Sequence, residues 1–265
     1  MVFDFVGDNW RQWFKLMVYF LLPFSVLLGT TLATVFDETS SSMSDMGYVI
    51  SAILIVLGCT VVTALEILLV KWYETHNYTL EACDVADMWR MLSRTAFKCL
   101  GIILLWTPVV VLAIMTMAIP IFGLVVFFAI LPVFLLCPIM LLEPPSSFSN
   151  LVSRAFSLGY KKWGTLILTA VVMGIVAILL NYSFSFLMGF FSSIELFFEQ
   201  STTDSVFWSF IYDILVYVLC VAGCFIIFVE IGLFVLAMTF YYGSVAAEAE
   251  DIGLESDIEN FANLK

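Results

Sequence analysis

The run from Cys99 to Leu142 contains no charged residue, and it constrains the fold more than any other feature of the sequence. At 1.5 Å per residue a helix of this length would reach about 66 Å, roughly twice the hydrocarbon thickness of a bilayer. The run is therefore too long for one membrane span and fits two. We expect the chain to reverse at Pro120 and Gly123, because proline removes a backbone donor and glycine relaxes a turn.

The composition agrees with a membrane location. Of the 265 residues, 63% are hydrophobic and 12% are charged, against about 25% charged residues in soluble domains. We predict an all-α, polytopic membrane protein with six transmembrane helices. The expected spans cover about residues 16–36, 47–70, 99–117, 121–142, 164–190 and 206–242. The sixth is longer than one span needs, so it must tilt, break or project beyond the bilayer.

The basic residues indicate how the spans are oriented. All ten lysines and arginines precede span one, connect spans two and three or spans four and five, or end the chain. The other connections carry none, and two of them are acidic. The positive-inside rule then predicts that both termini are cytoplasmic. The formal net charge of -12 gives the chain no general attraction for nucleic acid.

Two of the basic connections have helical periodicity and are predicted to be amphipathic helices in the headgroup plane, at about residues 80–98 and 146–163. Their candidate contacts with anionic lipid or with an acidic partner are Arg90, Arg94, Lys98, Arg154, Lys161 and Lys162. The first three form a row at i, i+4 and i+8. The tail, residues 243–265, is acidic enough from Glu248 to Glu259 to reach back to this row within the protein itself.

The chain also has a pattern of three similar units. Each unit begins with a basic segment and contains two spans, and the second span carries a glutamate toward its cytoplasmic half: Glu66, Glu143 and Glu230. Three pseudo-repeated helical hairpins explain this pattern. The alternative is that the units are not true repeats, because any basic segment that re-enters the membrane before a span looks similar.

The stretch from Pro138 to Gly164 resembles the signature of a family of six-helix bacterial inner-membrane proteins. In both, a glutamate ends one span, and an amphipathic helix with arginine and serine precedes the next; here these are Glu143 and Ser153-Arg154-Ala155. The ending Phe240-Tyr241-Tyr242-Gly243, followed by acidic residues, is similar too. The family includes the membrane domain fused to some glycerophosphodiester phosphodiesterases, and stand-alone members of unknown function. The resemblance implies a bacterial cytoplasmic membrane. It does not imply phosphodiesterase activity, which resides in a separate soluble barrel.

Four acidic residues in or near the spans are the candidate polar sites: Glu230, Asp213, Glu66 and Glu143. A charged acid within a bilayer is costly, so each is a functional hypothesis. Glu66 is close enough to Lys71 for its carboxylate to extend toward the headgroups. Glu230 has no cation within any span, and its expected partners are the hydroxyl groups of Thr60, Thr63 or Thr169, or the amide of Asn181. Its role is interhelical hydrogen bonding, proton or substrate handling, or the lining of a wet cavity.

The sequence provides no catalytic constellation. It has one histidine, no ligand spacing for a metal, no phosphate-binding loop and no nucleophile–base pair, so we predict no catalytic residue, metal or cofactor. The favoured hypothesis is a non-enzymatic scaffold or accessory subunit that acts through a membrane-protein partner or a second copy of itself. The alternative is a transporter or lipid-handling protein that uses the intramembrane carboxylates.

Overall fold

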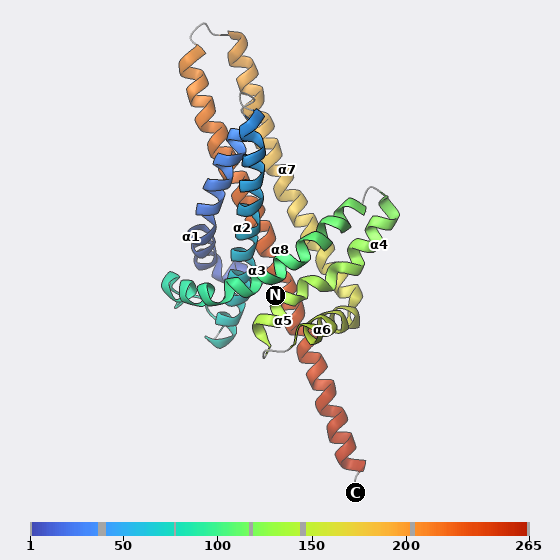
Figure 1. The fold of residues 1–265 in the computed structure, drawn as a ribbon. Helices are drawn as coiled ribbons and strands as arrows, with labels where there is room; N and C mark the ends of the chain where they lie inside the picture. Colours follow the sequence, from blue (N-terminus) through green and yellow to red (C-terminus); the bar gives the residue numbers. More distant parts are fainter. Residues whose placement is uncertain are drawn as a thin grey trace.

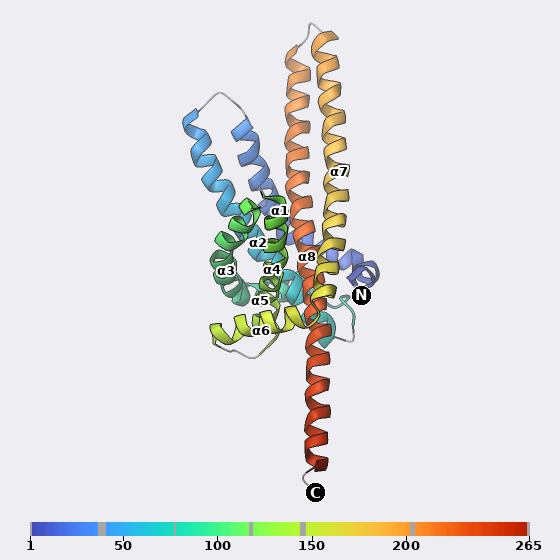
Figure 2. The ribbon, with the colours of Figure 1, turned by 90° about the vertical axis from the view of Figure 1, so that its right-hand side faces the viewer.

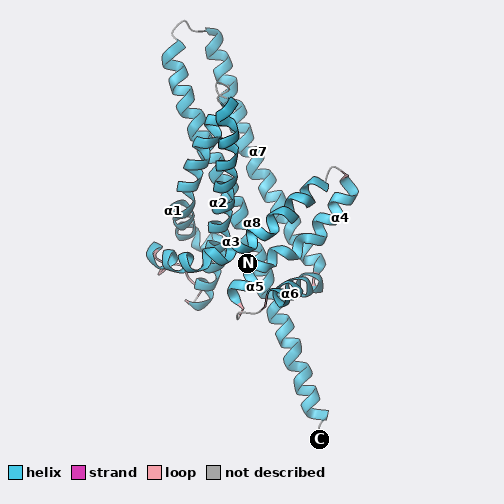
Figure 3. Cartoon of the chain, viewed as in Figure 1, coloured by secondary structure: helices cyan, strands magenta, loops and turns pink. Residues whose placement is uncertain are grey.

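The computed structural model describes residues 2–36, 41–76, 78–116, 119–143, 147–201 and 205–263, without the side chains of residues 32–36, 41–45, 110, 113–114, 120–121, 124, 188, 191–201, 205–213 and 250–263. All regular secondary structure in these ranges is helical (Figure 3). Six helical segments are long and apolar enough to cross a membrane: Val2–Thr31, Met46–Thr75, Val85–Val109, Val125–Leu142, Trp163–Leu187 and Ile214–Ala249. The predicted all-α, multi-pass architecture is confirmed at this level.

The helices follow one another with short connections. They are α1 (Val2–Phe36), α2 (Ser41–Thr75), α3 (Val85–Thr116), α4 (Pro120–Ile130), the 3₁₀ helix η1 (Leu131–Leu135), α5 (Leu136–Leu142), α6 (Phe148–Lys161), α7 (Trp163–Ser201) and α8 (Ser205–Asn263). The reversal expected in the long apolar run lies where it was predicted, because Ile119 is extended and Pro120 begins α4. Proline suits this position, since its missing N–H would have no helical partner there.

Helices α1, α2 and α8 pack together and form the first of two hydrophobic cores. Glycines let these helices approach closely. A Cβ atom on Gly58 would lie 2.3 Å from the ring of Phe228, and one on Gly29 would lie 3.1 Å from backbone atoms of Val221. Small residues at such crossings are typical of membrane helices, where close packing replaces the hydrophobic effect as the source of stability.

The second core joins α5, η1, α6 and α7 to α8. The pairs α1–α2 and α7–α8 point their connected ends the same way, while α6 and the C-terminal part of α8 lie toward the opposite end (Figures 1 and 2). The buried face of α6 consists of Leu151, Ala155, Leu158 and Gly159. Gly159 is packed so closely on Pro132 of η1 that a Cβ atom would lie 2.7 Å from that ring.

The differences from the predicted boundaries include one in α3 and one in α8. The helix expected at 80–98 and the span expected at 99–117 form one helix, α3, which begins only at Val85. No proline lies between Val85 and Pro108 to break the helix at the expected boundary, and Gly101 by itself does not interrupt it. The tail expected from residue 243 onward continues α8 as helix to Asn263, and α8 is about 88 Å long at 1.5 Å per residue. The sixth span therefore projects beyond the bundle (Figure 2).

Candidate functional site

A cavity of about 550 Å³ lies among α2, α3, η1, α7 and α8. Its walls are almost entirely apolar. They include Cys59 from α2, Ile102, Ile103 and Trp106 from α3, Phe127 from α4, Val133 and Phe134 from η1, Cys137 from α5, Met173 and Gly174 from α7, and Ile231, Phe234 and Met238 from α8. The volume lies within the range of about 300–1,000 Å³ found for small-molecule sites. The sequence did not reveal this cavity, because its lining residues come from seven helical segments that the tertiary fold brings together.

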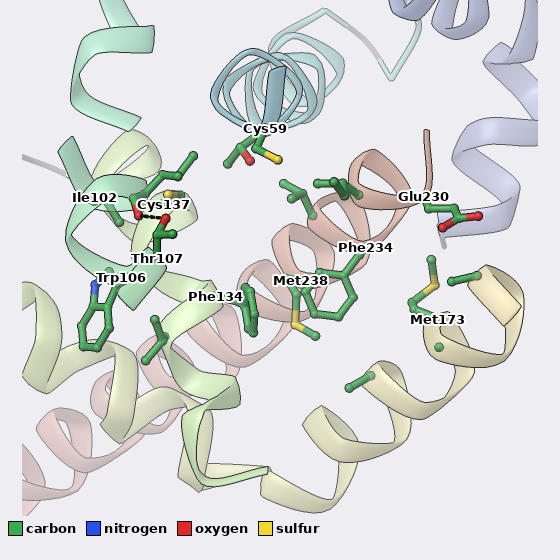
Figure 4. Close-up of a pocket in the computed structure, with 18 of the residues that line it drawn as sticks. Cys59, Ile102, Trp106, Thr107, Phe134, Cys137, Met173, Glu230, Phe234 and Met238 are labelled. Atoms are coloured by element: carbon green, nitrogen blue, oxygen red, sulfur yellow. Dashed lines mark hydrogen bonds between the residues drawn. The ribbon is translucent and has the colours of Figure 1, made fainter. Parts of the chain in front are cut away.

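One carboxyl group, that of Glu230, lines the cavity (Figure 4). Asn181 of α7, one of the partners expected from the sequence, donates from Nδ2 to both carboxyl oxygens at 2.8 Å. The same nitrogen donates to the carbonyl of Ala177 at 3.0 Å. Glu230 and Asn181 therefore form a polar pair between α7 and α8, at the edge of an otherwise apolar space.

Trp106 lines the opposite side of the cavity from Glu230 (Figure 4). Its indole Nε1 is buried and has no hydrogen-bond partner among the described residues. The neighbouring hydroxyl of Thr107 donates to the carbonyl of Ile103 at 2.7 Å, so it is satisfied within α3. A buried donor without a partner is costly, so the packing around Trp106 carries that cost.

Glu66 does not extend toward the headgroups, and that sequence expectation is wrong. Its side chain has 0% exposure, and it accepts hydrogen bonds from Nε1 of Trp13 at 2.9 Å and 3.2 Å. A Cβ atom on Gly232 would lie 3.0 Å from Oε1 of Glu66. The carboxyl is thus enclosed where α1, α2 and α8 meet, because it shares the inward face of α2 with Val62 and Leu69.

Glu143 is held in a polar cluster with two other residues. It ends α5 in an extended conformation, and its Oε1 accepts from Nε of Arg154 at 2.5 Å and from the hydroxyl of Tyr242 at 2.8 Å. These three residues come from α5, α6 and α8. The glutamate, the arginine and one tyrosine that carry the family resemblance are therefore in direct contact.

Two further contacts attach α6 to α8. The hydroxyl of Tyr241 lies 3.3–3.4 Å from the carbonyls of Leu158, Gly159 and Lys162, at the end of α6. Lys162 forms an ion pair with Glu248 of α8. Glu248, in the acidic continuation of α8, thus contacts Lys162. The expected contact of the tail with the row on α3 falls mostly on residues 250–263, whose side chains lie outside the described residues.

The remaining basic candidates are on the surface. Arg90, Arg94 and Lys98 are exposed along α3, and Lys161 is exposed in the last turn of α6. Trp89, which precedes the row on α3, stacks its ring on Phe20 of α1 at a centroid distance of 6.0 Å. Asp213 lies in α8, but its side chain is outside the described residues.

The cluster around Glu143 predicts a modest stabilising role for Arg154. We expect Arg154→Ala to lower the free energy of unfolding by about 1 kcal/mol, because the arginine is 40% exposed and water screens the pair. Lys161→Ala removes an exposed charge from the same helix, and we expect a change within about 0.5 kcal/mol. Denaturant unfolding in detergent measures both. Equal losses for the two variants would contradict the role given to the cluster.

The comparisons with known proteins identify no relative. No family model matches the chain, and no curated protein or solved structure is significantly similar to it. The family resemblance therefore stays a prediction from the sequence, and the functional argument depends on the geometry alone.

Proposed function

We propose that this chain is a non-enzymatic membrane protein that holds a lipid or a lipid-like amphiphile in the cavity next to Glu230. The observation that carries the proposal is an apolar space of about 550 Å³ inside the membrane-spanning part of the chain, where Glu230 is the one acidic side chain among the described residues of the wall. An apolar lining with few placed polar groups is the usual character of a small-molecule site. A hydrophilic solute would find almost no polar wall, which favours the lipid-handling alternative over transport of ions or sugars.

A scaffold or accessory subunit is the second candidate function. The observation that favours it is the exposed basic row of Arg90, Arg94 and Lys98, together with the length of α8 beyond the bundle. These features suit contact with anionic lipid headgroups, with a membrane-protein partner or with a second copy of the chain. A scaffold would tolerate changes in the cavity and would lose its partner when the row is neutralised.

We further propose that the protein resides in a bacterial cytoplasmic membrane with both termini in the cytoplasm. The charge distribution and the family resemblance support this, and α6 would then lie at the cytoplasmic headgroups. We expect a green fluorescent protein fused to the C-terminus to be fluorescent and alkaline phosphatase fused there to be inactive. The reverse result would contradict the orientation.

The repeat of three helical hairpins also stays a proposal. Its three glutamates, Glu66, Glu143 and Glu230, occupy three different environments in the structure.

Filling the cavity tests the proposed function. A Cβ atom on Gly174 meets nothing within 4 Å, so we expect Gly174→Phe to place its ring in the cavity without disturbing the helices. Native mass spectrometry of the protein extracted with its own lipids should show a retained amphiphile on the wild type and none on the variant. Ile175→Phe is the matched control, because Ile175 is 52% exposed and does not line the cavity. Equal retention by all three proteins would contradict the proposal.

A further inference from the structure

The polar pair at the cavity constrains the chemistry of what binds there. Asn181 supplies two amide hydrogens, and one of them is directed to the carbonyl of Ala177. The remaining hydrogen is shared between the two oxygens of Glu230. A carboxylate has about four acceptor positions, so Glu230 keeps most of its acceptor capacity for a donor outside the protein.

The described residues that line the cavity include no lysine, arginine or histidine that could pair with Glu230. Along α8, Glu230 lies roughly 24 Å from Ile214 and roughly 28 Å from Ala249, the ends of the sixth apolar segment. Glu230 is therefore well inside the apolar part of α8. An acidic group at such a depth is expected to pair with an opposite charge or with donors.

The remainder of the cavity favours a long apolar group. Ile102, Phe127 and Phe134 form one side of it, while Met173 and Met238 form another. Methionine side chains adapt to irregular apolar shapes, which suits an alkyl chain better than a rigid ring. The site thus combines an apolar channel for a chain with an acceptor group for a donating head.

We infer that the cavity binds a single-chain cationic amphiphile whose primary ammonium head donates hydrogen bonds to Glu230 and whose alkyl chain lies against Met173 and Phe234. An ammonium group has three donors and no acceptor, so it complements the free acceptor positions of the carboxylate. Charge-assisted hydrogen bonds of this kind are about twice as strong as neutral ones. This inference depends on the proposed function, because it assigns the head group of the same occupant.

Probes of equal chain length test the inference. Hexadecylamine, hexadecanol, palmitate and hexadecyltrimethylammonium are offered together at equal concentration to the purified full-length protein in detergent, and native mass spectrometry measures the bound fraction of each. We expect the amine to be preferred about tenfold over the alcohol and the carboxylate. The trimethylammonium probe carries the charge without an N–H donor, so we expect it to bind more weakly than the amine.

Variants separate this inference from the proposed function. Glu230→Gln and Glu230→Met should bind all four probes without preference, while Glu248→Gln, which removes a carboxylate outside the cavity, should keep the preference for the amine. Equal binding of the four probes to the wild type would overturn the inference but leave the proposed function intact, provided that Gly174→Phe abolishes it. Binding that Gly174→Phe does not reduce would overturn both. Loss of binding in Glu248→Gln would also contradict the assignment.

Discussion

Gly58→Ala is expected to lower the free energy of unfolding by about 1–3 kcal/mol, the usual cost of overpacking a core. A Cβ atom at this position would lie 2.3 Å from two atoms of the Phe228 ring. Phe228 is only 1% exposed, so the ring has no free space into which it can move. The helices α2 and α8 must separate to accept the methyl group. Unfolding of the purified protein in detergent, followed by circular dichroism, measures the loss.

A matched control variant and a compensating variant test whether close packing causes the stability loss expected for Gly58→Ala. Gly101→Ala adds the same methyl group to α3, where it meets nothing within 4 Å, and alanine is the better helix former by about 1 kcal/mol. We expect this variant to be as stable as the wild type or more stable. Phe228→Leu should restore part of the stability lost in Gly58→Ala. If Gly101→Ala and Gly58→Ala had the same effect, close packing of α2 on α8 would not explain the loss.

Removing either member of the Trp13–Glu66 pair is expected to have the second large effect. Trp13→Phe leaves a fully buried carboxyl without its indole donor, and Glu66→Leu leaves the indole without its acceptor. Each change should lower the free energy of unfolding by about 1–3 kcal/mol, the penalty of a buried group without a partner. Glu66→Gln keeps an acceptor for the indole, so we expect it to be considerably milder than Glu66→Leu.

The double variant, Trp13→Phe with Glu66→Leu, measures the interaction between the two side chains. When both partners are apolar, no buried polar group is left over, and the combined loss should be smaller than the sum of the single losses. We expect a coupling free energy of about 0.6–1.7 kcal/mol, the range between the average and the maximum for hydrogen bonds between membrane helices. Strict additivity of the two changes would mean that the contact between Trp13 and Glu66 contributes nothing to stability.

The helices of this chain could be predicted from the sequence, because long apolar segments between basic connections have few alternatives. The reversal at Pro120 was predicted from its local chemistry alone. The continuity of α3 was not, since a change from amphipathic to apolar composition does not by itself interrupt a helix. Only the absence of proline between Val85 and Pro108 indicated that the helix would continue.

The side-chain environments were harder to predict. Glu66 and Glu230 are both acids in apolar helices, yet Glu66 contacts Trp13 in a closed core and Glu230 lines a cavity. The difference depends on which helix faces each of them, and this is a property of the tertiary fold. Asn181 was among four expected partners of Glu230, and the sequence had no means of choosing it over the three threonines.

The contact of Glu143 with Arg154 and Tyr242 could be predicted in part: the residues could be, but their contact could not. The sequence singled out all three residues as parts of the family signature, but not as contacts of one another. In the structure they join α5, α6 and α8 at the end of the bundle that carries α6. The position of α6 under the cavity helices therefore depends on α8, the helix that also carries Glu230.

A density map of the protein in nanodiscs formed from its own membrane would show whether the cavity beside Glu230 holds an amphiphile. We expect one elongated feature between α3, α7 and α8, with its head about 3 Å from the carboxyl oxygens of Glu230. The Gly174→Phe protein should lack this feature. A wild-type map in which protein side chains close the cavity around Glu230, with no elongated feature beside it, would contradict the account.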